Sequence, residues 1–262
     1  MLKTIIFDLD DTLLWDKKSV KEALRATCLE AELKTGISHQ SLEQTVRKVA
    51  PSLYETFDTF EFTKKIGINP FEGLWGTFSD KTDLQFRKMY VTMPEYQKLT
   101  WTTALQQYNV EDKAFGSYLA ERFIFHRERL PYIYEDTFEV LADLNTEYTL
   151  IMLTNGSPTL QNKKLEMTPQ LVPYFDYIVV SGAFGVGKPD PSIFEHVLKL
   201  TDSNKDEAIM VGDNLNTDIS GSNAAGISNI WINRDSSDNL ENVPFTHEVK
   251  SLKAAGQIIV SL

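Results

Sequence analysis

Three aspartates, Asp8, Asp10 and Asp11, follow directly on the apolar run TIIF at residues 4–7. Acids at the end of a buried strand are costly, because burial and mutual repulsion both disfavour their charged forms. A cation at this place, or exposure of the side chains to water, would remove that cost. Asp8 and Asp10 point to the same side of an extended chain. Such a pair suits a nucleophile next to a general acid and base.

Polar groups also follow the later strand-like runs, where the carboxyl ends of parallel strands would bring them to one edge of a sheet. Thr154 and Asn155 end the run TLIMLT, Lys188 lies in GVGKPDP after the run YIVVSG, and Asp213 ends AIMVGD, with Asp218 one turn further on. Taken singly, each motif could be an ordinary turn or the start of a helix. Their shared position at strand ends favours one common site.

Phosphoryl transfer fits this set, because it needs a nucleophile, an acid for the leaving oxygen, a metal and donors for the phosphate oxygens. Asp8 is the candidate nucleophile and would form an aspartyl-phosphate. Asp10 would protonate the leaving group and then activate water.

The remaining groups would hold a metal and the phosphate. Mg²⁺ prefers oxygen ligands, so Asp8, the backbone carbonyl of Asp10 and the Asp213 carboxylate are the expected metal ligands. Thr154, Lys188 and the Asn155 backbone would bind the phosphoryl group. Asp218 and Asn214 would orient the metal ligands rather than bind the ion.

The elements that must position these residues alternate along the chain. Short apolar runs predict strands at 4–7, 149–154, 177–182, 208–213 and 229–233. Helical patterns lie between the later strands, at 135–146, 158–167, 191–200 and 217–225. Alternating strands and helices are typical of a parallel sheet covered by helices on both faces, an α/β fold.

Residues 17–133 have a different pattern and contain no convincing strand. Apolar spacing predicts helices at 41–49, 82–107 and 112–130. A further helix is expected from an N-cap at Ser19, with Glu22 as its capping-box partner, to a stop at Gly36. Residues 59–80 are rich in glycine and aromatic side chains and are expected to form an ordered loop. We therefore predict a core domain at 1–16 and 134–262 with a helical insertion at 17–133.

Composition excludes several classes of function. The 262 residues carry a net charge of −11 and have a pI near 4.9, whereas a general nucleic-acid or anionic-membrane binder would be basic. No apolar run is long enough to span a bilayer, and no signal peptide pattern opens the sequence. The single cysteine, Cys28, allows no intramolecular disulfide and is typical of a buried helix residue. We expect a cytoplasmic protein, a monomer or homodimer, acting on a small phosphorylated metabolite.

Four motifs together resemble those of the haloacid dehalogenase-like hydrolase superfamily, of the phosphatase type. They are DLDDT (8–12), LTNG (153–156), GKPDP (187–191) and GDNLNTD (212–218). The resemblance covers the whole predicted sheet domain. It implies a Rossmannoid three-layer core with strand order 5-4-1-2-3, an inserted all-helical cap, magnesium dependence and phosphatase activity on small metabolites. It also implies the roles given above for the motif residues, and a structural role for Thr12.

Three other functions stay open beside the phosphatase. The superfamily's founding dehalogenases lack a carboxylate two positions after the attacking Asp and need no metal, whereas this chain has Asp10 there. A phosphomutase would need a cap that retains and reorients a bisphosphate intermediate. A non-catalytic phosphate-binding protein would be expected to lack Asp8 or Asp10, and both are present.

The residues expected to bind the rest of the substrate are Leu9, Asn155, Trp15, Lys64 and Trp75, with Lys65, Phe71 and Phe78 as further candidates. Trp15 lies beside the expected hinge, and the others except Leu9 and Asn155 lie in the loop-like stretch. Aromatic side chains that line the site would favour a nucleotide, whereas Lys or Arg would favour a carboxylated or sugar phosphate. A simpler explanation is that the aromatic residues pack the helical insertion and the lysines are solvated.

Overall fold

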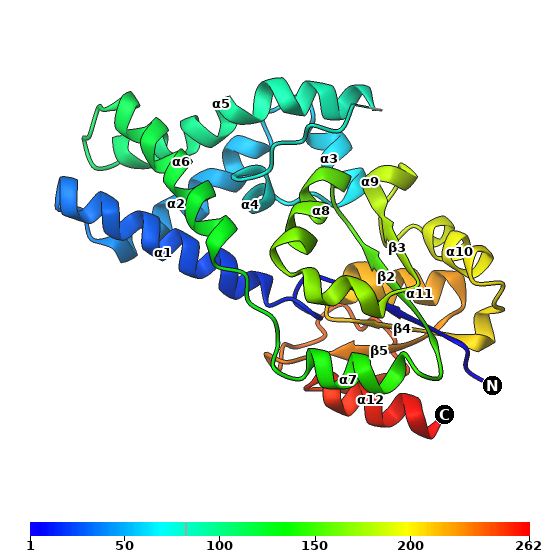
Figure 1. The fold of residues 1–262 in the computed structure, drawn as a ribbon. Coiled ribbons are helices and arrows are strands. Elements are labelled where there is room, and N and C mark those ends of the chain that lie inside the picture. Colours follow the sequence, from blue (N-terminus) through cyan, green and yellow to red (C-terminus); the bar gives the residue numbers. More distant parts are fainter. Residues whose placement is uncertain (82) are drawn as a thin grey trace. The chain divides into compact units, whose positions relative to one another are not determined.

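A six-stranded parallel sheet forms the centre of the α/β part of the molecule, seen in a computed structural model that describes residues 1–81 and 83–262 (Figure 1). Its strands are β1 (Thr4–Phe7), β2 (Thr149–Thr154), β3 (Tyr177–Val180), β4 (Ala208–Gly212), β5 (Ser228–Ile232) and β6 (His247–Val249). Their order across the sheet is β3-β2-β1-β4-β5-β6. From the other edge the first five strands have the predicted order 5-4-1-2-3, and β6 adds an edge strand that was not predicted.

The central strands are buried on both faces, as their continuous apolar sequences predict. On one face, Ile6, Ile151 and Met210 pack against Ile193 and Phe194 of the helix that follows Lys188. Helices α7 (Thr137–Leu144) and α12 (Leu252–Ser261) contact each other on the opposite face (Figure 1). The three-layer prediction is therefore confirmed.

The other helical segments of the α/β part are shorter. They are η1 (Pro169–Tyr174), α9 (Ser181–Phe184), α10 (Pro191–Leu200), η2 (Lys205–Glu207), η3 (Leu215–Ile219) and α11 (Ser220–Ala225). Asp190 caps α10 by accepting a hydrogen bond from the Ser192 amide, with Pro191 in the first turn. η3 is a π-helical turn that carries Asp218.

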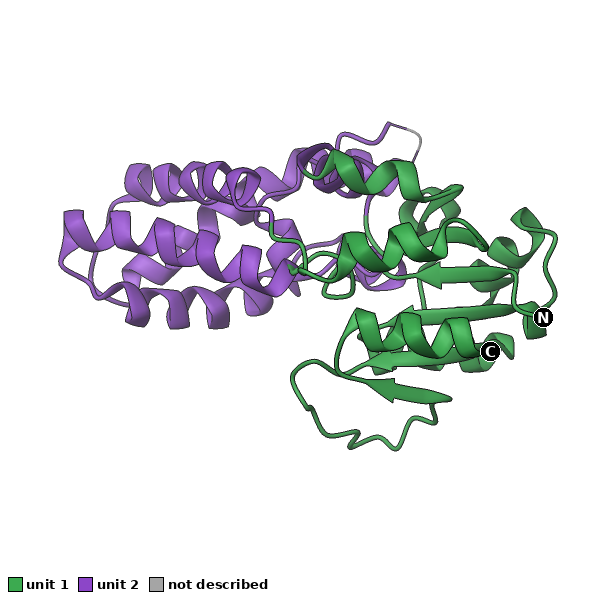
Figure 2. Cartoon of the chain, turned by 60° about the horizontal axis from the view of Figure 1, so that its bottom comes forward, with its two compact units in different colours: residues 1–15, 132–156, 168–262 green, residues 16–131, 157–167 purple. Residues whose placement is uncertain are grey.

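Two compact units make up the described chain (Figure 2). Residues 1–15, 132–156 and 168–262 form the α/β unit, and residues 16–131 and 157–167 form the helical unit. The predicted bounds of the insertion, 17–133, differ by one or two residues from the first crossing points. The structure groups residues 157–167 with the helical unit, however, whereas the sequence placed all of 134–262 in the core.

The four longest helices of the helical unit contact one another in pairs, α1 with α2 and α6, and α5 with α2 and α6. The helices of this unit are α1 (Asp16–Thr35), α2 (His39–Tyr54), α3 (Phe60–Ile66), α4 (Pro70–Gly73), α5 (Leu84–Gln106), α6 (Lys113–Arg129) and α8 (Pro158–Met167). Leu24, Tyr96, Trp101 and Phe123 are among the fully or nearly fully buried side chains of its core. The predicted helix 82–107 corresponds to α5. Residue 82, the first residue of the predicted helix, lies outside the described part of the chain. Among the described residues, no helix has the length and apolarity that crossing a membrane requires.

Two local predictions in this unit were wrong. Helix α1 begins at Asp16, ahead of the predicted N-cap at Ser19, and the Asp16 carboxylate forms a buried ion pair with Arg127 of α6. Residues 59–80 contain α3 and α4 rather than loop alone. The sequence carried the signal for α4, because Asn69 and Glu72 form a capping box around Pro70. The predicted stop at Gly36 is confirmed by its left-handed φ of 72°.

A cluster of polar side chains joins α1 to α6. The Glu30 carboxylate accepts hydrogen bonds from Arg122, His126 and Tyr118. Burial alone would raise the pKa of Glu30, but these hydrogen bonds outweigh burial and lower the pKa from 4.5 to about 2. A lowered pKa in the folded protein means stability that is present above pH 4.5 and lost as the pH falls toward 2.

Glu30→Gln is expected to lower the free energy of unfolding of the helical unit by about 1 kcal/mol at pH 7, after allowance for partial solvent screening of the pair. The difference between variant and wild type should shrink as the pH falls below 4.5, because Glu30 then binds a proton in the unfolded chain while its lowered pKa keeps it charged in the folded protein. Urea denaturation between pH 7 and pH 3 measures both values. Glu61→Gln, which alters an exposed pair with Lys64, is the control. A difference that stays constant with pH would contradict the assignment.

Candidate active site

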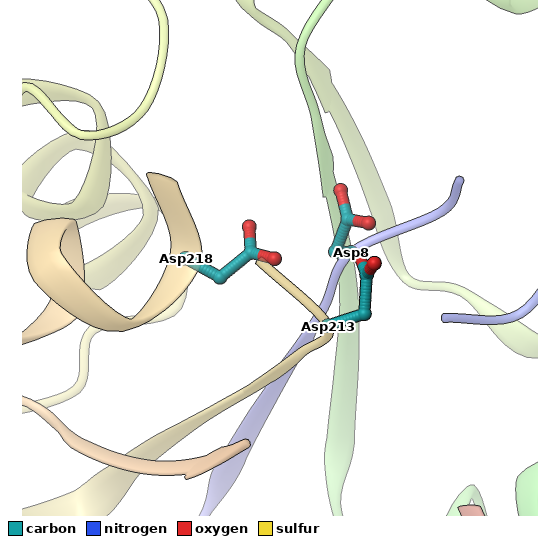
Figure 3. Close-up of side chains that lie close together, drawn as sticks. All are labelled: Asp8, Asp213 and Asp218. Carbon is teal, nitrogen blue, oxygen red and sulfur yellow. The ribbon is translucent and has the colours of Figure 1, made fainter. Parts of the chain in front are cut away.

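Three carboxylates meet at the carboxyl ends of β1 and β4 (Figure 3). Asp8 follows β1, Asp213 follows β4, and Asp218 lies in η3; one oxygen of each lies within 4.8 Å of the others. The amide of Asp8 donates to the Val211 carbonyl at 3.0 Å, so the pairing of β1 with β4 extends to the aspartate itself. Strand pairing thus brings together residues 210 positions apart in the sequence, as the strand-end argument predicts.

The ammonium of Lys188 lies between two of these acids. Its Nζ is 2.6 Å from Oδ1 of Asp8 and 2.7 Å from Oδ1 of Asp218, and it also donates to the Leu153 carbonyl at 2.8 Å. The Lys188 side chain is 1% exposed, and so is that of Asp218. A buried ammonium with three oxygen partners is a strongly held cation.

The pKa shifts follow from this arrangement. Burial lowers the pKa of Lys188, but Asp218 and Asp8 raise it further than burial lowers it, so the lysine keeps its charge. Burial is the largest effect on Asp8 and raises its pKa, against the opposing effect of Lys188, and Asp218, Asp213 and Asp10 raise it further. One ammonium therefore does not neutralise this cluster of carboxylates.

A cation with oxygen ligands fits this excess of negative charge. The carboxylates of Asp8 and Asp213 face the same small volume, and hard divalent cations such as Mg²⁺ prefer such oxygen donors. Asp218 belongs to the same cluster, but its Oδ1 pairs with Lys188 and its Oδ2 accepts from the Asn214 amide at 3.1 Å. Both carboxylate oxygens of Asp218 therefore have partners in the protein, and its orienting role stays a prediction.

The loop after β4 is shaped around Asp218. A Cβ atom at Gly212 would collide with the Asp218 side chain, so only glycine fits at the end of β4. Asn214 accepts from the Asn216 amide through its side chain and begins the π-helical turn that carries Asp218. Its observed contacts are therefore within this turn.

Asn155 holds the backbone of Lys188. Its Oδ1 accepts from the Lys188 amide at 2.9 Å, and its Nδ2 donates to the Lys188 carbonyl at 2.9 Å. These two bonds fix the loop after β3 to the end of β2. Thr154, also at the end of β2, is 1% exposed. The structure thus brings together Asp8, Lys188, Asn155, Asp213 and Asp218, and ends β2 at Thr154 next to them.

The chain turns sharply after Asp10. Asp11 has a φ of 62°, a left-handed conformation that aspartate tolerates better than most residues. Its amide donates to the Leu14 carbonyl at 2.6 Å. The Leu9 side chain is fully buried, so Leu9 can reach a ligand only through its backbone. Thr12 is also fully buried, which agrees with a structural role.

The remaining substrate-binding candidates lie in different surroundings. Trp15 is 39% exposed and stacks on Tyr134, with ring centroids 5.2 Å apart. Trp75 is buried in the core of the helical unit, and the Arg127 guanidinium lies 4.4 Å from its ring. Lys64 is exposed and pairs with Glu61. The packing of Trp75 and the solvation of Lys64 explain the positions of these side chains without a substrate. Their role in substrate binding stays a prediction.

Two residues at the end of β5 support the site and were not predicted. Trp231 Nε1 donates to the Asp213 carbonyl at 2.9 Å. The Arg234 guanidinium donates to the Thr12 carbonyl and to Asp136, and it lies 3.7 Å from the centre of the Tyr134 ring. The strand-end argument could have identified both residues, because WINR lies at the carboxyl end of β5.

Comparison with known proteins agrees with this geometry. A model of the haloacid dehalogenase-like hydrolases matches residues 2–226. The chain belongs to this family. Its resemblance in sequence motifs is thereby confirmed across most of the chain.

Two relatives that match over most of this chain are named as phosphatases. The phosphoserine phosphatase of Thermus thermophilus is 30% identical over 234 residues, which are 89% of each chain. The glyceraldehyde 3-phosphate phosphatase of Pyrococcus abyssi is 29% identical over 234 residues, 88% of this chain and 81% of the relative. The HAD-hydrolase YfnB of Bacillus subtilis, solved with bound magnesium, has a TM-score of 0.69 at 22% identity and covers 98% of both chains. At that identity the likeness to YfnB shows the fold.

Trp231→Phe is expected to weaken Mg²⁺ binding about fivefold, because the variant keeps the ring but loses a hydrogen bond worth about 1 kcal/mol that holds the Asp213 loop. Isothermal titration with Mg²⁺ measures the affinity directly. Trp101→Phe is the matched control, since the buried Trp101 Nε1 finds no hydrogen-bond acceptor among the described residues. Equal Mg²⁺ affinity of Trp231→Phe and wild type would show that the indole does not position Asp213.

Proposed function

We propose that this protein is a Mg²⁺-dependent phosphatase that hydrolyses a small phosphomonoester through an aspartyl-phosphate on Asp8. The observation that carries the proposal is the contact of the buried Lys188 ammonium with both Asp8 and Asp218, next to Asp213. This set supplies a nucleophile, a fixed positive charge and a place for a cation at one edge of the sheet.

Asp8 is proposed to attack phosphorus with a carboxylate oxygen, so that a P–O bond to Asp8 forms as the ester P–O bond breaks. Asp10 gives its proton to the departing alcohol oxygen. In the second step Asp10 takes a proton from water, the water oxygen bonds to phosphorus, and the bond to Asp8 breaks. The products are the alcohol and orthophosphate, and both aspartates return to their starting forms.

The other residues of the site bind and orient. Lys188 would offset the charge of the phosphoryl oxygens while its backbone is held by Asn155. Thr154 and the Asn155 backbone would donate hydrogen bonds to the same group. Asp8, the Asp10 carbonyl and Asp213 would hold Mg²⁺, which when bound would neutralise charge on the phosphoryl oxygens. Asp218 would keep Lys188 in place.

The substrate class is proposed to be a small phosphorylated metabolite. Two relatives that match over most of this chain are named for phosphoserine and for glyceraldehyde 3-phosphate. These compounds share a phosphomonoester and differ in the rest of the molecule. The residues described at the strand ends can recognise the shared group, so they support the class and leave the individual substrate to be measured.

With Mg²⁺, the protein is expected to hydrolyse p-nitrophenyl phosphate and at least one member of a panel of phosphoserine, triose, sugar and nucleoside monophosphates. EDTA should abolish this turnover, because the carboxylates would then repel the substrate's phosphoryl group. Ranking the panel by kcat/KM identifies the substrate class. Absence of turnover from folded protein under every condition would refute the phosphatase, and full turnover in EDTA would refute the metal.

Asp8→Asn is expected to reduce kcat by several orders of magnitude, since losses for a covalent nucleophile reach about a million-fold. Circular dichroism should show an unchanged fold, because Asn is isosteric with Asp. Asp11→Asn makes the same chemical change in the neighbouring turn, where Asn also tolerates a positive φ, and should retain activity. Substantial residual turnover in Asp8→Asn would exclude Asp8 as the nucleophile.

A further inference from the structure

Helix α8 follows the phosphate-binding residues of the α/β unit directly but packs within the helical unit. Its residues 157–167 group with 16–131, whereas Thr154, Asn155 and Gly156 belong to the α/β unit. The chain therefore crosses between the two units four times rather than twice. The contacts that hold α8 within the helical unit show how firmly it is attached.

One of these contacts is a buried ion pair. Lys164 Nζ of α8 lies 2.8 Å from Glu72 Oε1 of α4, and the two side chains are 1% and 5% exposed. The other carboxylate oxygen of Glu72 accepts from the Asn69 amide and completes the capping box of α4. Breaking a buried pair of this kind leaves an uncompensated charge, so the pair holds α8 at one defined place.

Two further contacts attach the first turn of α8. The Asp80 carboxylate accepts from the Thr159 amide at 2.9 Å, which places a negative charge at the start of the helix. Leu160 is 2% exposed and belongs to the apolar core of the helical unit. Helix α8 is thus tied to its unit by an apolar anchor and by charges at both ends.

The passage from one unit to the other takes place within a single peptide bond. On the α/β side, the Gly156 amide donates to Ser181 Oγ at 2.8 Å and the Gly156 carbonyl accepts from the Gly182 amide at 3.0 Å. On the helical side, Ser157 Oγ accepts from the Leu160 amide and caps α8. Gly156 has a φ of 143°, a conformation that glycine adopts far more readily than other residues.

We propose that α8 is a lever through which the helical unit positions Thr154 and Asn155, with the Glu72–Lys164 ion pair as its attachment. This inference rests on the proposed function, in which those two residues bind the phosphoryl group. Helix α8 is anchored within the helical unit, and only Gly156 and Ser157 stand between it and Asn155. Binding of phosphate and the position of the helical unit are therefore coupled, and such coupling is reciprocal.

The test compares wild type with the double variant Glu72→Gln/Lys164→Met. Gln can still complete the capping box, and neutral side chains of similar volume often replace a buried ion pair without loss of stability. Hydrogen exchange is followed by mass spectrometry with Mg²⁺, with and without orthophosphate. In wild type, orthophosphate should slow exchange at 154–156, in α8 and at 69–80. In the double variant the effect should stay at 154–156, and orthophosphate affinity should fall about tenfold.

The control removes another ion pair of the helical unit without touching α8. In Asp112→Asn/Lys34→Met, Asn can still cap α6, and the lost pair is the one between Lys34 and Asp112. This variant should behave as wild type in exchange and in orthophosphate affinity. A thermal melt of each variant shows whether the fold is retained.

Outcomes separate the lever from the proposed function. Orthophosphate protection at 69–80 that persists in the Glu72→Gln/Lys164→Met variant, or is missing in a wild type that binds orthophosphate, would overturn the lever. A wild type that neither turns over a phosphomonoester nor binds orthophosphate would overturn both. A wild type that binds orthophosphate and shows the predicted exchange pattern but lacks turnover would overturn the phosphatase alone.

Discussion

The arrangement of the site depends on the buried Lys188 ammonium between Asp8 and Asp218. Carboxylates gathered at strand ends repel one another and lose hydration, and without a cation they would not be held together in the interior. The neighbouring features serve this contact. Asn155 fixes the lysine backbone with two hydrogen bonds, and Gly212 leaves the room in which Asp218 approaches β4.

This constraint also explains why the site lies where the parallel strands end. Asp8, Lys188 and Asp218 come from distant parts of the chain. The pairing of β1 with β2 and β4, and of β2 with β3, brings their loops to one edge of the sheet. Strand β5 then stiffens that edge from the side, since Trp231 holds the Asp213 carbonyl and Arg234 holds the Thr12 carbonyl. The sheet thus positions the site, and the loops that follow its strands carry the charged residues.

The sequence predicted the structure well where a residue pattern is compatible with only one arrangement of the chain. Continuous apolar runs predicted five of the six strands, β1 to β5, and the rule that parallel strand ends meet predicted which acids would lie near Asp8. It was less informative for short elements. β6 has three residues and was not predicted. α4 was not predicted either, although the capping signal of Asn69 and Glu72 was present.

The grouping of α8 with the helical unit depends on tertiary contacts rather than on local sequence. Local sequence indicates that residues 158–167 form a helix, but the partner of a helix is decided by tertiary contacts such as Glu72 with Lys164, whose residues lie far apart in the chain. An insertion between two strands predicts two connections between units, because it counts only where the chain leaves and rejoins the sheet. Packing adds a second pair of connections at 156–157 and 167–168. Thr154 and Asn155, which we propose bind the phosphoryl group, therefore lie next to one of these crossings, and the proposed coupling to the helical unit depends on tertiary packing rather than on local sequence.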